Sequence, residues 1–107
     1  MPKFMIQGSY SPEGTRGLMH DGGTKRRDVV SSLISKWGGT MESFYFGFGD
    51  ADVYVTFDLP DVTAAAALSL AVNASGAVSL KTIPLITVEE MDKAAQSQVA
   101  YIAPGAA

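Results

Sequence analysis

The residues most able to do chemistry cluster in the stretch from Phe46 to Tyr54, which reads FGFGDADVY. Its two glycines and two acids could belong to a phosphate-binding loop, to an acidic metal or catalytic site, or to a turn between strands. A dinucleotide-binding glycine motif stands between a strand and a helix, whereas a β pattern follows here. Asp50 and Asp52 supply too few oxygen ligands for a metal site. We therefore predict a central hairpin, in which Gly49 turns the chain and Asp52 anchors the start of the next strand.

A second set of candidates lies between Ser11 and Thr24. His20 is the only histidine of the chain, and histidine exchanges protons readily near neutral pH. With Arg16 four residues before it, His20 is a candidate general base, although an exposed loop histidine is the alternative. The segment Gly22 to Lys25 contains Walker-type residues, but Lys follows Thr instead of preceding it, so a phosphate loop is disfavoured.

Composition excludes several other functions. One histidine and no cysteine disfavour a zinc site, and no motif predicts a metal or a cofactor. The net charge is −3 and the one basic cluster is Lys25-Arg26-Arg27, which we interpret as the solvated first turn of a helix. Nucleic-acid binding needs a broader basic surface and is therefore disfavoured.

Apolar residues make up 47% of the chain and charged residues 18%. The apolar share is sufficient for a real core, and the low charge suggests that another subunit covers part of the surface. No run approaches the roughly 18 apolar residues of a membrane span, and the segment MPKFMIQGSY lacks the apolar region of a signal peptide. We expect a cytoplasmic protein that contacts neither membrane nor nucleic acid.

Periodicity predicts the order of the secondary structure in a single domain, residues 1–107. Alternating apolar residues predict strands at 3–10, 41–48, 51–58 and 78–86, and helical spacing predicts helices from Lys25 to Gly38 and from Asp61 to Gly76. Residues 11–24 carry Pro12 and four glycines, which indicates a loop with room for one short helical turn. A capping box at Thr87 to Glu90 starts a short last helix, and residues 98–107 are expected to be a frayed tail.

This order is β-α-β-β-α-β with a trailing helix. It predicts an α+β, ferredoxin-like fold, with a four-stranded antiparallel sheet, two helices on one face and a short C-terminal helix.

Strand alternation also predicts which side chains share a face. Ten apolar residues fall on the side suited to packing under the helices: Phe4, Ile6, Phe44, Phe46, Phe48, Val53, Val55, Phe57, Val78 and Leu80. The other side is mixed, with Gln7, Ser9, Tyr45, Tyr54, Thr56, Lys81 and Ile83. Such a face suits contact with a second subunit or a ligand, and a plain solvated surface is the alternative.

Several short stretches resemble the GYD family of small bacterial proteins. They are a strand ending at Tyr10 and followed by Thr15-Arg16, a helix ending at Trp37-Gly38-Gly39, and the aromatic strand Ser43 to Phe46 that runs into Gly49-Asp50-Ala51-Asp52-Val53. The Ala-rich helix after Pro60-Asp61 and the stretch from Ile83 to Glu90 are also similar. The resemblance covers about residues 3–92 and implies a ferredoxin-like fold, dimeric α/β-barrel assembly and no settled activity. The tyrosine that names the family falls at Ala51, so a role tied to that ring does not carry over.

Three functional hypotheses follow. The first is a homo-oligomer that binds a small molecule on the mixed face, with Gln7, Tyr45 and Tyr54 orienting the ligand and Arg16 or His20 reaching over from the loop. The second is a small cofactor-independent enzyme, an oxygenase or isomerase, with His20 as base. The third is a pure assembly or interaction module.

Overall fold

The computed structural model describes residues 1–106 and contains a helix or strand over most of them. The elements in chain order are β1 (Lys3–Tyr10), α1 (Pro12–Asp21), α2 (Gly23–Lys36), β2 (Thr40–Phe46), β3 (Val53–Asp58), α3 (Val62–Ala74), β4 (Val78–Leu85) and α4 (Val88–Gln96).

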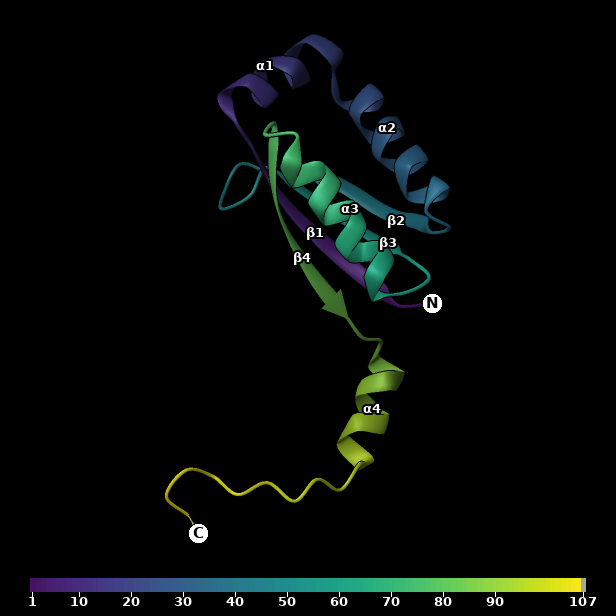
Figure 1. Ribbon diagram of the computed structural model, residues 1–107, viewed down its shortest axis with the longest axis vertical. Helices are drawn as coiled ribbons and strands as arrows, with labels where there is room; N and C mark the ends of the chain where they lie inside the picture. The colour runs from purple at the N-terminus through teal and green to yellow at the C-terminus, as the bar shows by residue number, and fades with distance from the viewer. Residues whose placement is uncertain (107) are drawn as a thin grey trace.

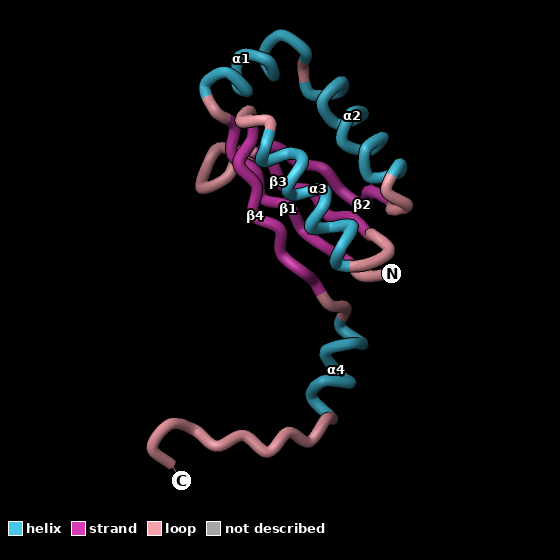
Figure 2. The backbone as a smooth tube through the Cα atoms, viewed as in Figure 1, coloured by secondary structure: helices cyan, strands magenta, loops and turns pink. Residues whose placement is uncertain are grey.

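The strands form one sheet in the order β2-β3-β1-β4, and every neighbouring pair is antiparallel. β1 therefore lies inside the sheet, between β3 and β4, and helical connections carry the chain from β1 to β2 and from β3 to β4 (Figure 2). This order confirms the predicted ferredoxin-like α+β fold.

Both α2 and α3 lie on one face of the sheet (Figure 1). The core forms between them and the strands: Phe4 and Phe57 stack with their ring centroids 6.0 Å apart, and Ile34 of α2 and Leu68 of α3 are buried against the sheet. Each such side chain contributes about 1.5–3 kcal/mol of burial free energy. The apolar residues that alternate along β1 and β3 supply the sheet side of this core.

Residues 11–24 differ from the prediction, because most of them are helical. The Ser11 hydroxyl accepts a hydrogen bond from the Gly14 N–H at 3.0 Å, and Pro12 starts the helix with a fixed φ. These signals outweigh the low helix propensity of the glycines within α1. Gly22, with a φ of +82°, then separates α1 from α2.

The β2–β3 connection is longer than predicted. β2 ends at Phe46 and β3 begins at Val53, so six residues, 47–52, form the connection. Phe48 is fully exposed instead of lying in the core. None of residues 47–52, all of which the structure describes, has a positive φ, so the chain turns at Gly49 without the left-handed conformation that glycine favours. The Gly47 N–H donates to the Asp52 carbonyl at 2.8 Å and closes the loop.

Two helix starts agree with the sequence. The Asp61 carboxylate accepts from the Ala64 N–H at 2.8 Å and caps α3. Thr87 and Glu90 form the predicted capping box of α4. Hydrogen bonding from the Thr87 backbone N–H to the Glu90 carboxylate lowers the pKa of Glu90 below its usual value.

The C-terminal segment extends away from the sheet and its helices (Figure 1). No residue of α4 is buried, and residues 98–106 form no helix or strand; residue 107 of the predicted tail lies outside the described residues. The radius of gyration is 17.1 Å, compared with about 13 Å for a compact chain of this length. Over the described residues, no helix is both long enough and apolar enough to cross a membrane.

Gly14 and Gly17 provide a matched test of how α1 packs. A Cβ at Gly14 would lie 2.2 Å from the Ala77 carbonyl oxygen, whereas a Cβ at Gly17 meets nothing within 4 Å. We expect Gly14→Ala to lower the free energy of unfolding by about 1–3 kcal/mol. Gly17→Ala should raise it by about 0.5–1 kcal/mol. Urea unfolding followed by circular dichroism measures both, and equal effects would contradict the packing of α1 on the turn before β4.

Candidate functional site

Three of the predicted ligand-binding residues lie side by side on the sheet. Gln7 pairs with Tyr54, and Tyr54 pairs with Tyr45. On the other side Gln7 pairs with Lys81. Directly paired residues of antiparallel strands point to the same face, so these four side chains form one row across all four strands.

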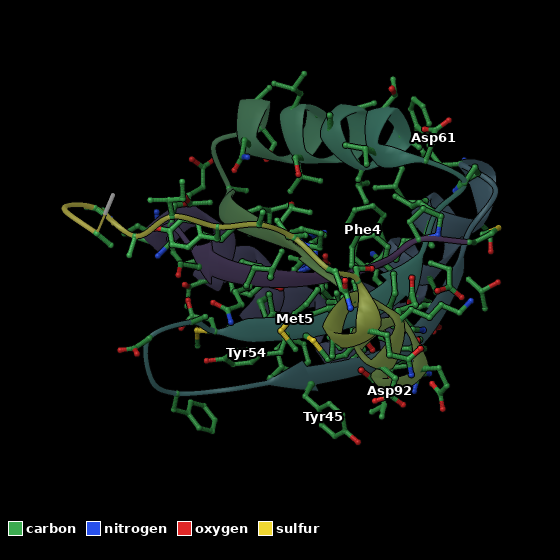
Figure 3. All side chains as sticks on the ribbon, turned by 90° about the horizontal axis from the view of Figure 1, so that it is seen from below. Phe4, Met5, Tyr45, Tyr54, Asp61 and Asp92 are labelled. Carbon is green, nitrogen blue, oxygen red and sulfur yellow. The ribbon has the colours of Figure 1, made fainter. Side chains whose placement is uncertain are left out.

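The face that carries this row is free of helices. Phe4 points toward α3, whereas Met5, Tyr45 and Tyr54 lie on the opposite side of the sheet (Figure 3). We call this side the open face and define it by Met5, Gln7, Ser43, Tyr45, Tyr54, Thr56, Lys81 and Ile83. Tyr45 is 69% exposed, and its neighbours Gln7 and Tyr54 are half-buried.

Polar side chains next to the two tyrosines contact one another on the open face. Ser43 and Thr56 join their hydroxyls at 2.5 Å, and the Gln7 amide lies 3.9 Å from the Met5 sulfur. Sulfur is a weak acceptor, so the Gln7 amide retains hydrogen-bonding capacity for another molecule. The open face thus offers aromatic planes, hydroxyls and an amide, which suit binding better than proton transfer.

The charges near the open face are mostly paired. Lys3 bonds to Glu42 and, at 3.2 Å, to Asp58. Hydrogen bonding to Glu42 and then to Asp58 raises the pKa of the Lys3 ammonium. The Lys3 ammonium therefore offsets one of the two carboxylate charges at this end of the sheet.

Arg16 and His20 lie elsewhere. Both belong to α1, which sits at one end of the sheet next to α2 (Figure 1), and no described contact joins either to Gln7, Tyr45 or Tyr54. The His20 side chain is 88% exposed and hydrogen-bonds to Asp21 at 3.1 Å. The hydrogen bond with His20 is the main cause that lowers the pKa of Asp21, and the positive charge of Lys25 lowers it further. This geometry adds no support for His20 as a general base.

Asp52 ties the β2–β3 loop to the end of β1. Its carboxylate accepts from the Tyr10 N–H at 2.9 Å, and its own N–H donates to the Gly8 carbonyl at 2.8 Å. Asp50 is exposed. Both hydrogen bonds of Asp52 thus go to the backbone of β1.

Two neighbours of Asp52 also have structural roles. Ala51, where the family resemblance places an aromatic ring, is buried. A Cβ at Gly47 would lie 2.8 Å from the Tyr54 ring, so this glycine allows the ring to lie close to the backbone.

Arg26 is a candidate that the sequence interpretation missed. Lys25 and Arg27 are exposed, as expected of a solvated turn, but Arg26 points into a cleft between α2, α3 and the sheet. It shares its helix face with Val29, Val30 and Leu33, which also line the cleft. The spacing i, i+3, i+4, i+7 is the signal that could have separated Arg26 from its basic neighbours.

Among residues 1–106, no three His, Cys, Asp or Glu side chains come close enough to hold a metal ion. Comparison with protein families matches residues 4–95 to the GYD domain. The chain belongs to the GYD domain family. Comparisons with curated proteins and with solved structures gave no match. The family agrees with the resemblance seen in the sequence, and the function of this GYD protein has to be inferred from its own geometry.

The loop anchor can be tested at Asp52, with Asp50 as the control. Asp52→Ala leaves the Tyr10 N–H without its carboxylate acceptor, and we expect the free energy of unfolding to fall by about 1–3 kcal/mol. Asp50→Ala should change it by less than about 0.5 kcal/mol. Urea unfolding measures both free energies. A larger loss of stability in Asp50→Ala than in Asp52→Ala would show that Asp52 is not the anchor.

Proposed function

We propose that this GYD protein is a homo-oligomer that binds a small molecule, and that the open face supplies both the subunit contact and part of the ligand site. The observation that carries the proposal is the uncovered row of Tyr45, Tyr54 and Gln7, set on a sheet whose other face carries the helices α2 and α3.

The chemistry of the open face favours a second copy as its cover. Met5, Ile83 and the two tyrosines present apolar area beside hydroxyl and amide groups, which is the mixture found in protein interfaces. A twofold axis that lies between two open faces would pair this face with itself, as closed dimers require. The low proportion of charged residues in the chain is consistent with such a covered surface.

The extended α4 also fits an assembly. Val88 and Met91 are exposed, and the helix leaves the body of the subunit beyond β4 (Figure 1). An amphipathic helix without buried residues has little reason to be stable alone. A neighbouring subunit would supply the missing contact.

A ligand held between copies would use the groups that the protein leaves unpaired. The Gln7 amide can donate or accept, and Tyr54, its paired neighbour in the same row, adds a hydroxyl. The aromatic rings of Tyr45 and Tyr54 would favour a flat molecule. If no such molecule binds, the open face serves assembly alone.

The assembly can be measured by light scattering after size exclusion over a series of concentrations. We expect a multiple of the chain mass for the wild type. Tyr45→Glu should raise the dissociation constant at least tenfold, because it buries an unpaired charge in the contact. Leu70→Glu, at an exposed apolar site on α3, should change nothing. A monomeric wild type would remove the proposed assembly.

Ligand binding on the open face can be measured by thermal shift against a metabolite panel, followed by titration of each hit. Gln7→Ala and Tyr54→Phe should each weaken a hit by about 2–10-fold, because each removes one hydrogen bond. Ser35→Ala, at an exposed position of α2 on the other side of the sheet, is the control. A hit that tolerates both substitutions binds somewhere other than the open face.

A further inference from the structure

The helix-covered side of the sheet contains a cleft of its own. It encloses about 360 Å³ between α2, α3 and the strands, near the lower end of the roughly 300–1,000 Å³ typical of small-molecule sites. Its walls are aliphatic and aromatic, with Val30 and Leu33 from α2, Phe44 from β2, and Leu68 and Val72 from α3. The cleft therefore suits a compact apolar body.

Arg26 adds a charge to this apolar lining. Among the lining residues, all of which the structure describes, it is the only one with a full charge. Its Nε atom is buried and has no hydrogen-bond partner among residues 1–106. A buried donor on a charged group costs free energy unless an acceptor reaches it, so this site lacks an acceptor.

The nearby carboxylates do not supply that acceptor. Asp21 engages His20 and Lys25, at 3.1 Å and 3.5 Å, and Asp28 engages Arg27 at 3.2 Å. Each basic neighbour of Arg26 thus has a described partner, while the Arg26 side chain has none among residues 1–106.

The position of Arg26 gives an anion a route to it. Arg26 also lines an adjoining pocket of about 290 Å³, together with Tyr10, Gly14 and Ser75. Glu13 and Asp21, both exposed, also line this pocket, which disfavours ligands with several negative charges. One guanidinium facing an apolar cleft matches a single carboxylate joined to an apolar body.

We propose that the cleft binds a small amphipathic monocarboxylate, with its carboxylate on Arg26 and its apolar body between Val30, Leu33 and Leu68. This site lies on the opposite side of the sheet from the open face and does not depend on the proposed assembly. The carboxylate supplies the missing acceptor for Nε, and the apolar body fills the space between the two helices.

Octanoate and 3-phenylpropionate are suitable probes of different shape, and octanamide is the neutral counterpart of octanoate. Isothermal titration of the full chain should show saturable binding of at least one carboxylate, with octanamide at least tenfold weaker than octanoate. Arg26→Gln should weaken carboxylate binding at least tenfold and leave octanamide unchanged. Arg27→Gln, on the same helix with an exposed guanidinium, should bind like the wild type.

Ala71→Phe is a second variant, at an exposed position that lines the cleft. It should weaken octanoate and octanamide alike because it occupies their space, so the test survives if Arg26→Gln fails to fold. Circular dichroism establishes that each variant is folded. Tyr45→Glu should bind octanoate like the wild type, which separates this site from the assembly.

Four results would overturn the proposal. They are no binding of either carboxylate, equal affinity for octanoate and octanamide, unchanged carboxylate binding in a folded Arg26→Gln, and unchanged octanoate binding in a folded Ala71→Phe.

Discussion

The pairing of β1 with β3 is the constraint on which the other features of this protein depend. Phe4 lies opposite Phe57 and Gln7 opposite Tyr54, so one register places the aromatic core on one face and the polar row on the other. Because side chains alternate with a period of two, a slip by one residue would exchange the faces. Asp52 bonds to the backbone of Gly8 and Tyr10 where this pairing ends, and so holds the register at the loop end of the strands.

The same register determines where the helix layer closes and where it stays open. Ala64 and Ala65, early in α3, are buried, and their small side chains let this half of the helix lie close to the sheet. Later in α3, Ala71 and Val72 line the cleft instead. The fold thus combines a closed core at one end of α3 with an apolar cleft at the other, next to the first turns of α2.

Local signals account for the parts of the fold that the sequence predicts. Asp61 and the Thr87–Glu90 box cap their helices through hydrogen bonds within a few residues, and β1 alternates between buried and half-buried residues from Lys3 to Gly8. Residues 11–24 were predicted wrongly because glycine content suggested a loop. The helix depends partly on Gly14 packing against the backbone at Ala77, a contact between residues far apart in the chain. The alternation of aromatic residues continues to Phe48, so Phe48 was predicted to lie in the strand. Alternation alone cannot show that the pairing of β2 with β3 ends at Phe46.

The candidate site residues also differ in whether local sequence patterns could predict their positions. Strand alternation was sufficient to predict that Gln7, Tyr45 and Tyr54 share one face. Arg16 and His20 were expected to reach this face from a loop, but the segment that carries them is a helix. Arg26 was grouped with its charged neighbours, although helical spacing places it with Val29, Val30 and Leu33. Whether a cleft remains open beside that face depends on the distance between α2 and α3, which no local pattern encodes.

β1 forms a wall of both regions, since Ile6 lines the cleft and its neighbour Gln7 lies on the open face. Adjacent residues of one strand face opposite sides of the sheet, so any coupling between a ligand in the cleft and a partner on the open face has its shortest physical route through this strand.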